Sequence, residues 1–303
     1  MTEHKRRGQR GRSKATLDLI QTCLEIIEER QPISVRGVCY ALFVSDHIDS
    51  MAKENTGKIS RVLTQMREEG VLPWEWIVDD SRCMEGGGGF TDLKQYARVI
   101  RKSYHRNFWA HQTKRVIVIS EKATVAGIVR PVLDEYGVPF FAAHGYNSAT
   151  KVYDLAQEIV TDKRVYHFLY IGDYDPSGMN MSELDMPGRL ERYCNIVMQQ
   201  LGNGYPSIFH FDRVALVQED TASLPSFDVE KKKLDRRYKW FVENYGDRAW
   251  ELDAMNPNDL RDRVEQEILQ HVDSEGWEQH QRVEEAQQKS VEAIADKMAA
   301  AMA

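Results

Sequence analysis

Two aspartates separated by one residue follow an apolar stretch near the middle of the chain. Residues 168–171 read FLYI and continue as GDYDPSG, which places Asp173 and Asp175 directly behind the apolar run. In an extended backbone, side chains two residues apart point the same way and lie ~7 Å apart. Pro176 and Gly178 end strands and favour turns. The pattern predicts two carboxylates facing one site at the end of a buried strand, although turn chemistry alone also explains it.

A third carboxylate, Glu121, follows the apolar residues 115–120, RVIVIS. Parallel strands place their sites at their carboxyl ends. If strands 115–120 and 168–171 are neighbours, ~4.8 Å apart, Glu121 reaches the aspartate pair. Carboxylate oxygens are ligands that suit Mg²⁺, which commonly acts on phosphates. The three acids therefore predict a Mg²⁺ site for phosphoryl chemistry.

The elements around these acids alternate along the chain between apolar runs and helical patterns. Helical spacing covers residues 124–136, 148–160 and 188–202, and apolar runs VPFFAAH and YHFLYIG separate them. Alternation of this kind predicts a parallel sheet with helices on both faces.

The N-terminal part predicts three helices and a strand. Residues 16–29 have helical spacing behind Thr16, Ser34 caps a second helix, and Thr56 caps a third that stops at Gly70. The alternating run VLPWEWIVDD, residues 71–80, then predicts a β-wing. Three helices and a wing indicate a winged-helix module, and a small structural bundle explains the same pattern equally well.

Basic residues gather in patches despite the formal net charge of −7. On the third predicted helix, Lys58 and Arg61 share the side opposite the buried stripe, a pattern suited to a DNA groove. The segment 93–115 contains no acid and interleaves aromatic residues with basic ones, among them Arg98, Arg101, Lys102 and Arg106. A further basic run is 231–239, KKKLDRRYK. These patches permit nucleic-acid binding, whereas a solvated surface is the plainer interpretation of each.

Composition limits the class of protein. The chain has 303 residues, of which 42% are hydrophobic and 29% charged, as in globular proteins. No apolar window approaches the ~20 residues that a membrane span requires, and no signal-like apolar segment follows the basic N-terminus. We therefore expect a cytoplasmic protein with no membrane partner. Cys23, Cys39, Cys83 and Cys194 contain no CxxC pair and are expected to be reduced thiols.

The glycine run 86–89 lacks the Gly-Lys-Ser/Thr of a phosphate-binding loop and predicts a linker. The expected division is a basic arm over 1–14, a winged-helix domain over 15–85, a linker with the basic segment over 86–114, a domain with the parallel sheet over 115–270 and a helical tail over 271–303.

A strand ending in Glu121 and a strand ending in Asp-x-Asp together resemble a Toprim domain, which occurs in topoisomerases, primases and some nucleases. Residues 144–155, HGYNSATKVYDL, followed by GDYDPSG, are similar to the Toprim domain of the topoisomerase VI A-subunit family. The resemblance covers residues 30–270 and is strongest to the stand-alone mini-A homologues of bacteria, phages and plasmids. Residues 251–268 belong to the same resemblance, with no chemistry assigned to them.

In that family a winged-helix domain precedes the Toprim domain and supplies a tyrosine nucleophile from an Arg-acidic-x-aromatic-Tyr motif. Residues 34–40, SVRGVCY, would match it with Arg36 and Tyr40, although Gly37 stands at the acidic position and Cys39 at the aromatic one. The resemblance implies an α/β fold with an N-terminal winged helix followed by a Toprim domain. It further implies a homodimer on double-stranded DNA, with room for a separate ATPase subunit, in a nucleoid-associated protein or one encoded by a mobile element.

The expected function is Mg²⁺-dependent DNA cleavage by transesterification. Tyr40 would attack a backbone phosphate, Arg36 would favour the phenolate, and Glu121, Asp173 and Asp175 would hold the metal, with proton transfer as another role for Glu121. From the residues alone, Arg36 and Tyr40 four apart on a helix are more usually a surface cation–π or packing contact than a nucleophile with its activating cation.

Two alternatives remain open. One is a hydrolytic Toprim nuclease in which a metal-bound water attacks the phosphate. The other is a DNA-binding subunit whose catalysis is dormant.

Overall fold

A computed structural model of the chain describes residues 14–78, 92, 95–96, 99, 104–143, 149–162, 164–202 and 209–300. The chain divides into two compact units. The smaller contains Met1–Asp79 and Asp253–Asn258, and the larger contains Asp80–Leu252 and Asp259–Ala303. No helix in the described ranges has both the length and the apolar character needed to cross a membrane.

Three helices form the smaller unit, α1 (Lys14–Arg30), α2 (Val35–Val44) and α3 (Lys53–Glu68). Ser34 begins α2 as its N-cap, because its hydroxyl oxygen accepts a hydrogen bond from the Gly37 amide. Gly70, with φ of +73°, follows the end of α3 and adopts the left-handed conformation that glycine tolerates best. The buried faces of the helices meet in one core, made of Cys23, Ile27, Val38, Leu42, Ile59, Leu63 and Met66. The three expected helices are confirmed.

Two of these helices begin earlier than the capping residues predicted. α1 begins at Lys14 rather than behind Thr16, and α3 begins at Lys53 rather than behind Thr56. Within α3 the Thr56 hydroxyl donates to the Ala52 carbonyl oxygen at 3.3 Å. A threonine hydroxyl bonds a preceding carbonyl inside a helix as readily as it caps one, which explains why these two N-cap predictions were wrong.

The predicted β-wing is not found in the described part of residues 71–80. The strand there is limited to β2 (Ile77–Val78), which pairs in parallel with β1 (Ile33–Ser34). Before it, Trp74–Trp76 form the 3₁₀ turn η1, and the Arg67 guanidinium lies 4.9 Å from the centroid of a Trp74 ring. The alternation of apolar residues therefore comes from a turn packed on α3 rather than from a long strand.

The larger unit is built on a parallel sheet of four strands in the order β4-β3-β5-β6. The strands are β3 (Lys114–Ser120), β4 (Phe140–Ala142), β5 (Val165–Ile171) and β6 (Phe209–Ala215). A mixed α/β fold with a mainly parallel sheet is thereby confirmed. β6 was not among the expected strands, because His210, Asp212 and Arg213 interrupt its apolar pattern at the edge of the sheet.

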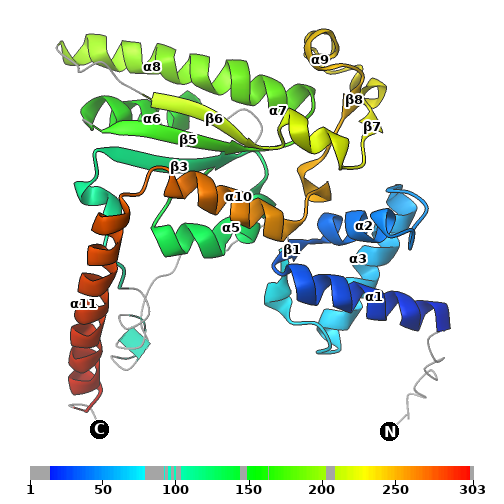
Figure 1. Ribbon diagram of the computed structural model, residues 1–303, viewed down its shortest axis with the longest axis horizontal. Helices are drawn as coiled ribbons and strands as arrows, with labels where there is room; N and C mark the ends of the chain where they lie inside the picture. Colours follow the sequence, from blue (N-terminus) through cyan, green and yellow to red (C-terminus); the bar gives the residue numbers. More distant parts are fainter. Residues whose placement is uncertain are drawn as a thin grey trace, which may run out of the picture. The chain divides into compact units, whose positions relative to one another are not determined.

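The strand order creates a switch point between β3 and β5. From β3 the chain passes through α5 (Ala123–Tyr136) to β4, and then through α6 (Ala149–Thr161) past β3 to β5. Right-handed crossovers in opposite directions place their helices on opposite faces of a sheet. Figure 1 shows α6 and α8 (Met186–Leu201) on one face and α5 and α10 (Pro257–Leu269) on the other. A ligand crevice is expected outside the carboxyl ends of the strands at such a point.

One apolar core fills the face of the sheet that α6 and α8 cover. Side chains from β3 and β5, including Ile117, Ile119, Phe168 and Tyr170, pack there against both helices. On the other face, the Tyr136 hydroxyl of α5 donates to Glu265 of α10 at 2.8 Å. Helices therefore pack on both faces of the sheet.

The remaining elements connect and extend this sheet. η2 (Phe108–His111) precedes β3, α7 (Pro176–Asn180) and the π-helical turn η3 (Met181–Asp185) lead into α8, and η4 (Gln218–Ala222) follows β6. The short strands β7 (Phe227–Asp228) and β8 (Arg248–Ala249) pair antiparallel around η5 (Val229–Lys232) and α9 (Tyr238–Tyr245). η6 (Leu252–Ala254) precedes α10, and α11 (Ser274–Ala300) ends the described chain.

Three histidines stack against the amino-terminal half of β5. The His167 ring centroid lies 4.8 Å from that of His210 and 4.0 Å from that of His271. Burial, together with His271, His210 and Lys114, lowers the pKa of His167 from 6.5 to about 4. The folded state therefore favours the neutral imidazole.

We expect the stability of the larger unit to fall as the pH drops from about 6.5 towards 4. The pKa of His167 is about 4 in the folded protein and 6.5 in the unfolded chain, so between these values the unfolded chain binds a proton that the folded protein does not. The free energy of unfolding is therefore highest above pH 6.5 and falls as the pH drops towards 4. His167→Phe keeps an aromatic ring and should flatten this dependence in denaturant titrations between pH 4 and 7. His47→Phe, at an exposed position of the smaller unit, is the control. An unchanged pH profile for His167→Phe would contradict the assignment.

Candidate active site

Two strand ends bring the predicted acids to one edge of the sheet. β3 and β5 are neighbouring parallel strands, and Ser120 at the end of β3 pairs in register with Ile171 at the end of β5. Glu121 follows the first strand directly, and Asp173 lies two residues behind the second. The expectation that these strands are neighbours is confirmed, and it places the acids at the switch point.

Asp173 is held by contacts from two other segments. Its Oδ1 atom accepts hydrogen bonds from the Lys122 ammonium at 2.8 Å and from the Leu252 amide at 2.8 Å. Burial raises the pKa of Asp173, and the neighbouring carboxylate of Asp175 adds to the rise, whereas Lys122 opposes it. The carboxylate is therefore fixed in direction while its charge is poorly solvated.

Asp175 begins α7 rather than ending a strand. Its Oδ1 atom accepts a hydrogen bond from the Gly178 amide at 2.7 Å, and Pro176 occupies the first turn of the helix. The second oxygen, Oδ2, accepts from the Lys232 ammonium. Asp175 is 2% exposed, so the side chain acts at once as a helix cap and as a buried member of the acid cluster.

Two glycines make this crowded loop possible. A Cβ atom on Gly178 would stand 2.1 Å from the Asp173 carbonyl oxygen, and a Cβ on Gly172 would stand 2.6 Å from the Tyr170 hydroxyl. A larger residue at 178 would displace the backbone of Asp173, and one at 172 would displace the Tyr170 ring. The turn chemistry of GDYDPSG and the convergence of its acids are thus two results of one local structure.

Glu121 lies close to both aspartates. The Ser177 hydroxyl is 3.5 Å from its Oε2 atom, which brings the end of β3 against the start of α7. Burial raises the pKa of Glu121, and the charges of Asp175 and Asp173 raise it further, whereas Arg237 and Lys122 act in the opposite direction. The three carboxylates thus form one electrostatic cluster, in which the pKa of Glu121 is raised.

Arg213 of β6 supports the loop from behind. Its guanidinium donates to the carbonyl oxygens of Gly172 at 3.2 Å, Leu216 at 2.7 Å and Asp173 at 3.2 Å. It also lies over the ring of Tyr170, 5.0 Å from the centroid. One fixed cation therefore holds the backbone that carries the acids and offsets part of their charge.

The donor set suits Mg²⁺, because it consists of carboxylate oxygens from two strand ends. In this arrangement the ammonium groups of Lys122 and Lys232 contact two of the acids. Within the described ranges, no group of three His, Cys, Asp or Glu side chains is arranged to hold a metal ion. The cluster attracts positive charge, and metal binding would require the lysine ammonium groups to give way.

Arg36 and Tyr40 lie together on α2 of the smaller unit. The Arg36 guanidinium carbon is 5.8 Å from the centroid of the Tyr40 ring, a cation–π contact. Arg36 is exposed, whereas Tyr40 is 6% exposed. The pairing of these two side chains agrees with their spacing, and their chemical roles stay predictions.

The N-cap of α2 has a partner from a distant part of the sequence. The Ser34 hydroxyl donates to the Asp253 carboxylate at 2.5 Å while its oxygen accepts from the Gly37 amide at 2.9 Å. A hydroxyl bonded to a charged acceptor makes a short and strong hydrogen bond. Asp253 therefore fixes the start of the helix that carries Arg36 and Tyr40.

The residues predicted to contact DNA differ in their exposure, and only some of them lie in the described part of the chain. Lys58 and Arg61 are exposed on α3, as expected, and the Arg61 Nε atom donates to the Gly57 carbonyl oxygen at 3.1 Å. Arg106 is half-buried, and its amide donates to Glu284 of α11 at 3.0 Å. A final group of expectations lies outside the described residues: Arg98, Arg101, Lys102, Cys83, the glycine run 86–89 and residues 144–148.

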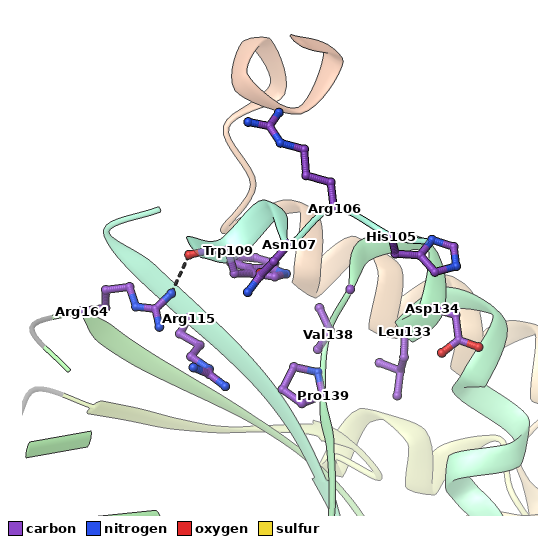
Figure 2. A pocket seen from close by; sticks show the side chains of 11 residues that line it. His105, Arg106, Asn107, Trp109, Arg115, Leu133, Asp134, Val138, Pro139 and Arg164 are labelled. Atoms are coloured by element: carbon purple, nitrogen blue, oxygen red, sulfur yellow. Dashed lines mark hydrogen bonds between the residues drawn. The ribbon is translucent and has the colours of Figure 1, made fainter. Parts of the chain in front are cut away.

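A pocket of about 650 Å³ lies at the opposite edge of the sheet, where the strands begin. Figure 2 shows Arg106, Arg115 and Arg164 on its wall, with Arg164 donating to the Trp109 carbonyl oxygen. Arg115 pairs with Glu158, and Arg164 pairs with Asp162. Two of its cations are thus already paired, which makes this pocket a weaker candidate than the acid cluster.

Sequence patterns did not identify Lys232, Arg213 or Asp253 as residues of these sites. Each comes from a segment far from the acids or from Tyr40 in the sequence, and none stands in a recognisable motif with them. The basic run 231–239 and the acidic segment 251–268 were visible as patterns, but their partners are set by the fold.

Comparison of the chain with protein-family models, with curated proteins and with solved structures gave no match. The function is therefore inferred from the chemistry of the site.

Replacing Arg213 should destabilise the larger unit. We expect Arg213→Met to lower the free energy of unfolding by about 2 kcal/mol, because the carbonyl oxygens of Asp173 and Leu216 lose the guanidinium donor and the acids lose one of their cations. Urea denaturation at neutral pH measures the effect. Arg130→Met, at a side chain that is 54% exposed, is the matched control and should change stability by less than about 0.5 kcal/mol. Equal stability of the two variants would contradict a supporting role for Arg213.

Replacing Ser34 should loosen the start of α2. We expect Ser34→Ala to cost about 1 kcal/mol, because the Gly37 amide loses its acceptor and the Asp253 carboxylate loses its donor. Hydrogen exchange of the first-turn amides of α2 should become faster, while that of α3 changes little. Asp18→Ala, at an exposed position of α1, serves as the control. Unchanged exchange in α2 would argue against the cap.

Proposed function

We propose that the protein cleaves DNA by a Mg²⁺-dependent reaction at the acid cluster, with Tyr40 as the nucleophile. The observation that carries this proposal is the convergence of Glu121, Asp173 and Asp175 at the switch point of a parallel sheet. Three clustered carboxylates are costly unless positive charge compensates them. A divalent cation that also binds a DNA phosphate would supply this positive charge.

The proposed reaction is a transesterification. The Tyr40 oxygen attacks phosphorus, a bond forms between them, and the bond from phosphorus to the 3′ oxygen breaks. The products are a 5′ phosphotyrosyl ester and a free 3′ hydroxyl. If the lysines gave way, Glu121, Asp173 and Asp175 would hold Mg²⁺, which would supply positive charge to stabilise the phosphate and the leaving oxygen.

The residues of the chain supply proton transfer and orientation. A tyrosine has a pKa near ~10, so its phenolate needs a positive neighbour, and Arg36 lies over the ring. As an alternative to holding the metal, Glu121 is suited to deliver a proton to the leaving oxygen, because burial and the aspartates raise its pKa. Lys122 contacts Asp173 until metal binds, and Arg213 donates to the Asp173 carbonyl oxygen.

The resemblance of the sequence to the topoisomerase VI A-subunit family supports this reading, with a winged-helix domain before a Toprim domain. It implies a homodimer on double-stranded DNA in which Tyr40 of one protomer acts with the acids of its partner. Breaks in both strands follow from that symmetry. A separate ATPase subunit would be needed only for coupled strand passage.

The second candidate is a hydrolytic nuclease, and the burial of Tyr40 favours it. At 6% exposure the phenol must become accessible before it can reach a phosphate. In the hydrolytic reaction water attacks instead, and Tyr40 serves as a packing residue beside Arg36. The third candidate, a DNA-binding subunit with dormant catalysis, is favoured by the lysine contacts that two of the acids already make.

Tyr40→Phe distinguishes the first two candidates. With supercoiled plasmid and Mg²⁺, the unaltered protein should give broken DNA carrying protein on its 5′ ends after denaturant is added. Tyr40→Phe should lose both the breaks and the adduct, because the attacking oxygen is absent. Gel mobility before and after protease treatment measures the outcome.

Two controls complete the experiment. Tyr153→Phe removes another tyrosine hydroxyl, one that donates to Gln200 on the surface of the larger unit, and should leave cleavage intact. Asp173→Asn should abolish cleavage by either mechanism. Breaks without adduct in Tyr40→Phe would establish hydrolysis, and binding without any cleavage by the unaltered protein in Mg²⁺ or Mn²⁺ would indicate the dormant subunit.

A further inference from the structure

The segment 230–237, EKKKLDRR, forms a basic loop beside the acid cluster. It holds five basic and two acidic side chains. Lys232 of this loop contacts Asp175, and Arg237 acts electrostatically on Glu121. The basic loop therefore lies next to the carboxylates. The proposed roles of the acids do not explain the other residues of the loop.

Several contacts fix the backbone of the basic loop. Val229 is fully buried at its base, and the Asp228 carboxylate accepts from the Glu230 amide at 2.8 Å. The Asp235 amide donates to the Lys232 carbonyl oxygen at 2.8 Å, which closes a turn. The Arg237 side chain then donates to both carboxylate oxygens of Asp235, each at 2.7 Å. The tip of the loop is consequently presented in a defined position.

Leu234 stands at that tip with a relative exposure of 103%, whereas the next most exposed large apolar residue, Val44, reaches 63%. A turn does not require leucine at its centre, since Gly, Asn, Asp and Ser serve better there. A fully exposed leucine also contributes nothing to a core. On this hydrogen-bonded turn, Leu234 is therefore accessible to a binding partner.

The charges around Leu234 identify the kind of surface. Lys231 and Arg236 are exposed, and neither makes an ion pair within the part of the chain that the structure describes. Lys233 makes one contact at 3.5 Å, to Glu230, and both side chains of that pair are more than 60% exposed. An exposed apolar residue that lies within three positions of the exposed cations Lys231 and Arg236 fits a polyanion with an apolar interior. Duplex DNA is such a partner, because phosphates flank its stacked bases.

We propose that the basic loop binds duplex DNA beside the acid cluster and inserts Leu234 between neighbouring base pairs from the minor groove. Lys231, Lys233 and Arg236 then contact the flanking phosphates. Apolar wedges of this kind unstack one base step and kink the duplex. This inference rests on the proposed function in taking DNA as the substrate, and it adds that the DNA is bent next to the cleavage site.

The test uses the full chain and a short duplex labelled at both ends with a fluorescent donor and acceptor. Binding is followed by anisotropy over a range of salt concentrations, and bending by energy transfer between the ends. Tyr40→Phe protein repeats both measurements without any cleavage. Leu234→Ala should lose the bend and bind on the order of tenfold more weakly, with the salt dependence unchanged, because all the cations remain.

The basic residues should show the opposite pattern. Arg236→Gln should lower the slope of log K against log salt by about one, since one phosphate contact is lost, while the bend is retained. Leu269→Ala, at an apolar position of α10 that is 45% exposed, should match the unaltered protein in every measurement. Leu234 and Arg236 are exposed, so these variants are expected to fold normally.

Three results would overturn the inference. Leu234→Ala could bind and bend DNA like the unaltered protein. It could change sedimentation of the free protein instead, which would make the loop a contact between protein copies. The unaltered protein could also bind the duplex without bending it. Failure of the proposed function would give a different result. The protein would still bind and bend DNA through Leu234, but it would form no covalent adduct through Tyr40.

Discussion

Repulsion between three crowded carboxylates is the constraint on which the site depends. Glu121, Asp173 and Asp175 share one edge of the sheet, and burial together with the charges of the two aspartates raises the pKa of Glu121. Such a cluster persists in a folded protein only when surrounding groups compensate it. In this fold the compensating groups are Arg213, which donates to the backbone of the loop, and the lysines that contact the aspartates. The surroundings of the acids therefore carry positive charge.

The same short loop serves local structure and chemistry. Asp175 caps α7, Pro176 starts that helix, and Gly178 leaves room for the backbone of the preceding aspartate. Each of these roles is ordinary turn and helix-start chemistry. Because the loop follows a strand at a switch point, the same local chemistry also places its acids at the carboxyl edge of the sheet. Turn formation and site formation are therefore not competing explanations of GDYDPSG.

Two neighbouring residues each make a contact inside their own unit. Within the larger unit, the Leu252 amide donates to Asp173, and within the smaller unit, Asp253 accepts from the Ser34 hydroxyl that caps α2. The segment 251–268, to which the sequence assigned no chemistry, therefore contains one residue that holds Asp173 and one that holds the start of α2.

The sequence by itself determined the elements and the local chemistry. Apolar periodicity predicted the parallel sheet and the helices of both units, because the spacing of buried residues follows from the geometry of each element. The placement of Glu121 and Asp173 at strand ends followed for the same reason. The pattern failed where one local signal had two physical causes, as with Thr56 inside α3 and the apolar residues before Ile77.

Only the tertiary structure decided which distant residues complete the site. Lys232 reaches Asp175, Arg213 supports the loop, and Asp253 reaches Ser34 across 219 positions of sequence. No periodicity encodes such partners, because they are selected by the folded arrangement of segments that are far apart in the chain. The physical reason is that charge compensation requires proximity in space, whereas sequence patterns report proximity along the backbone.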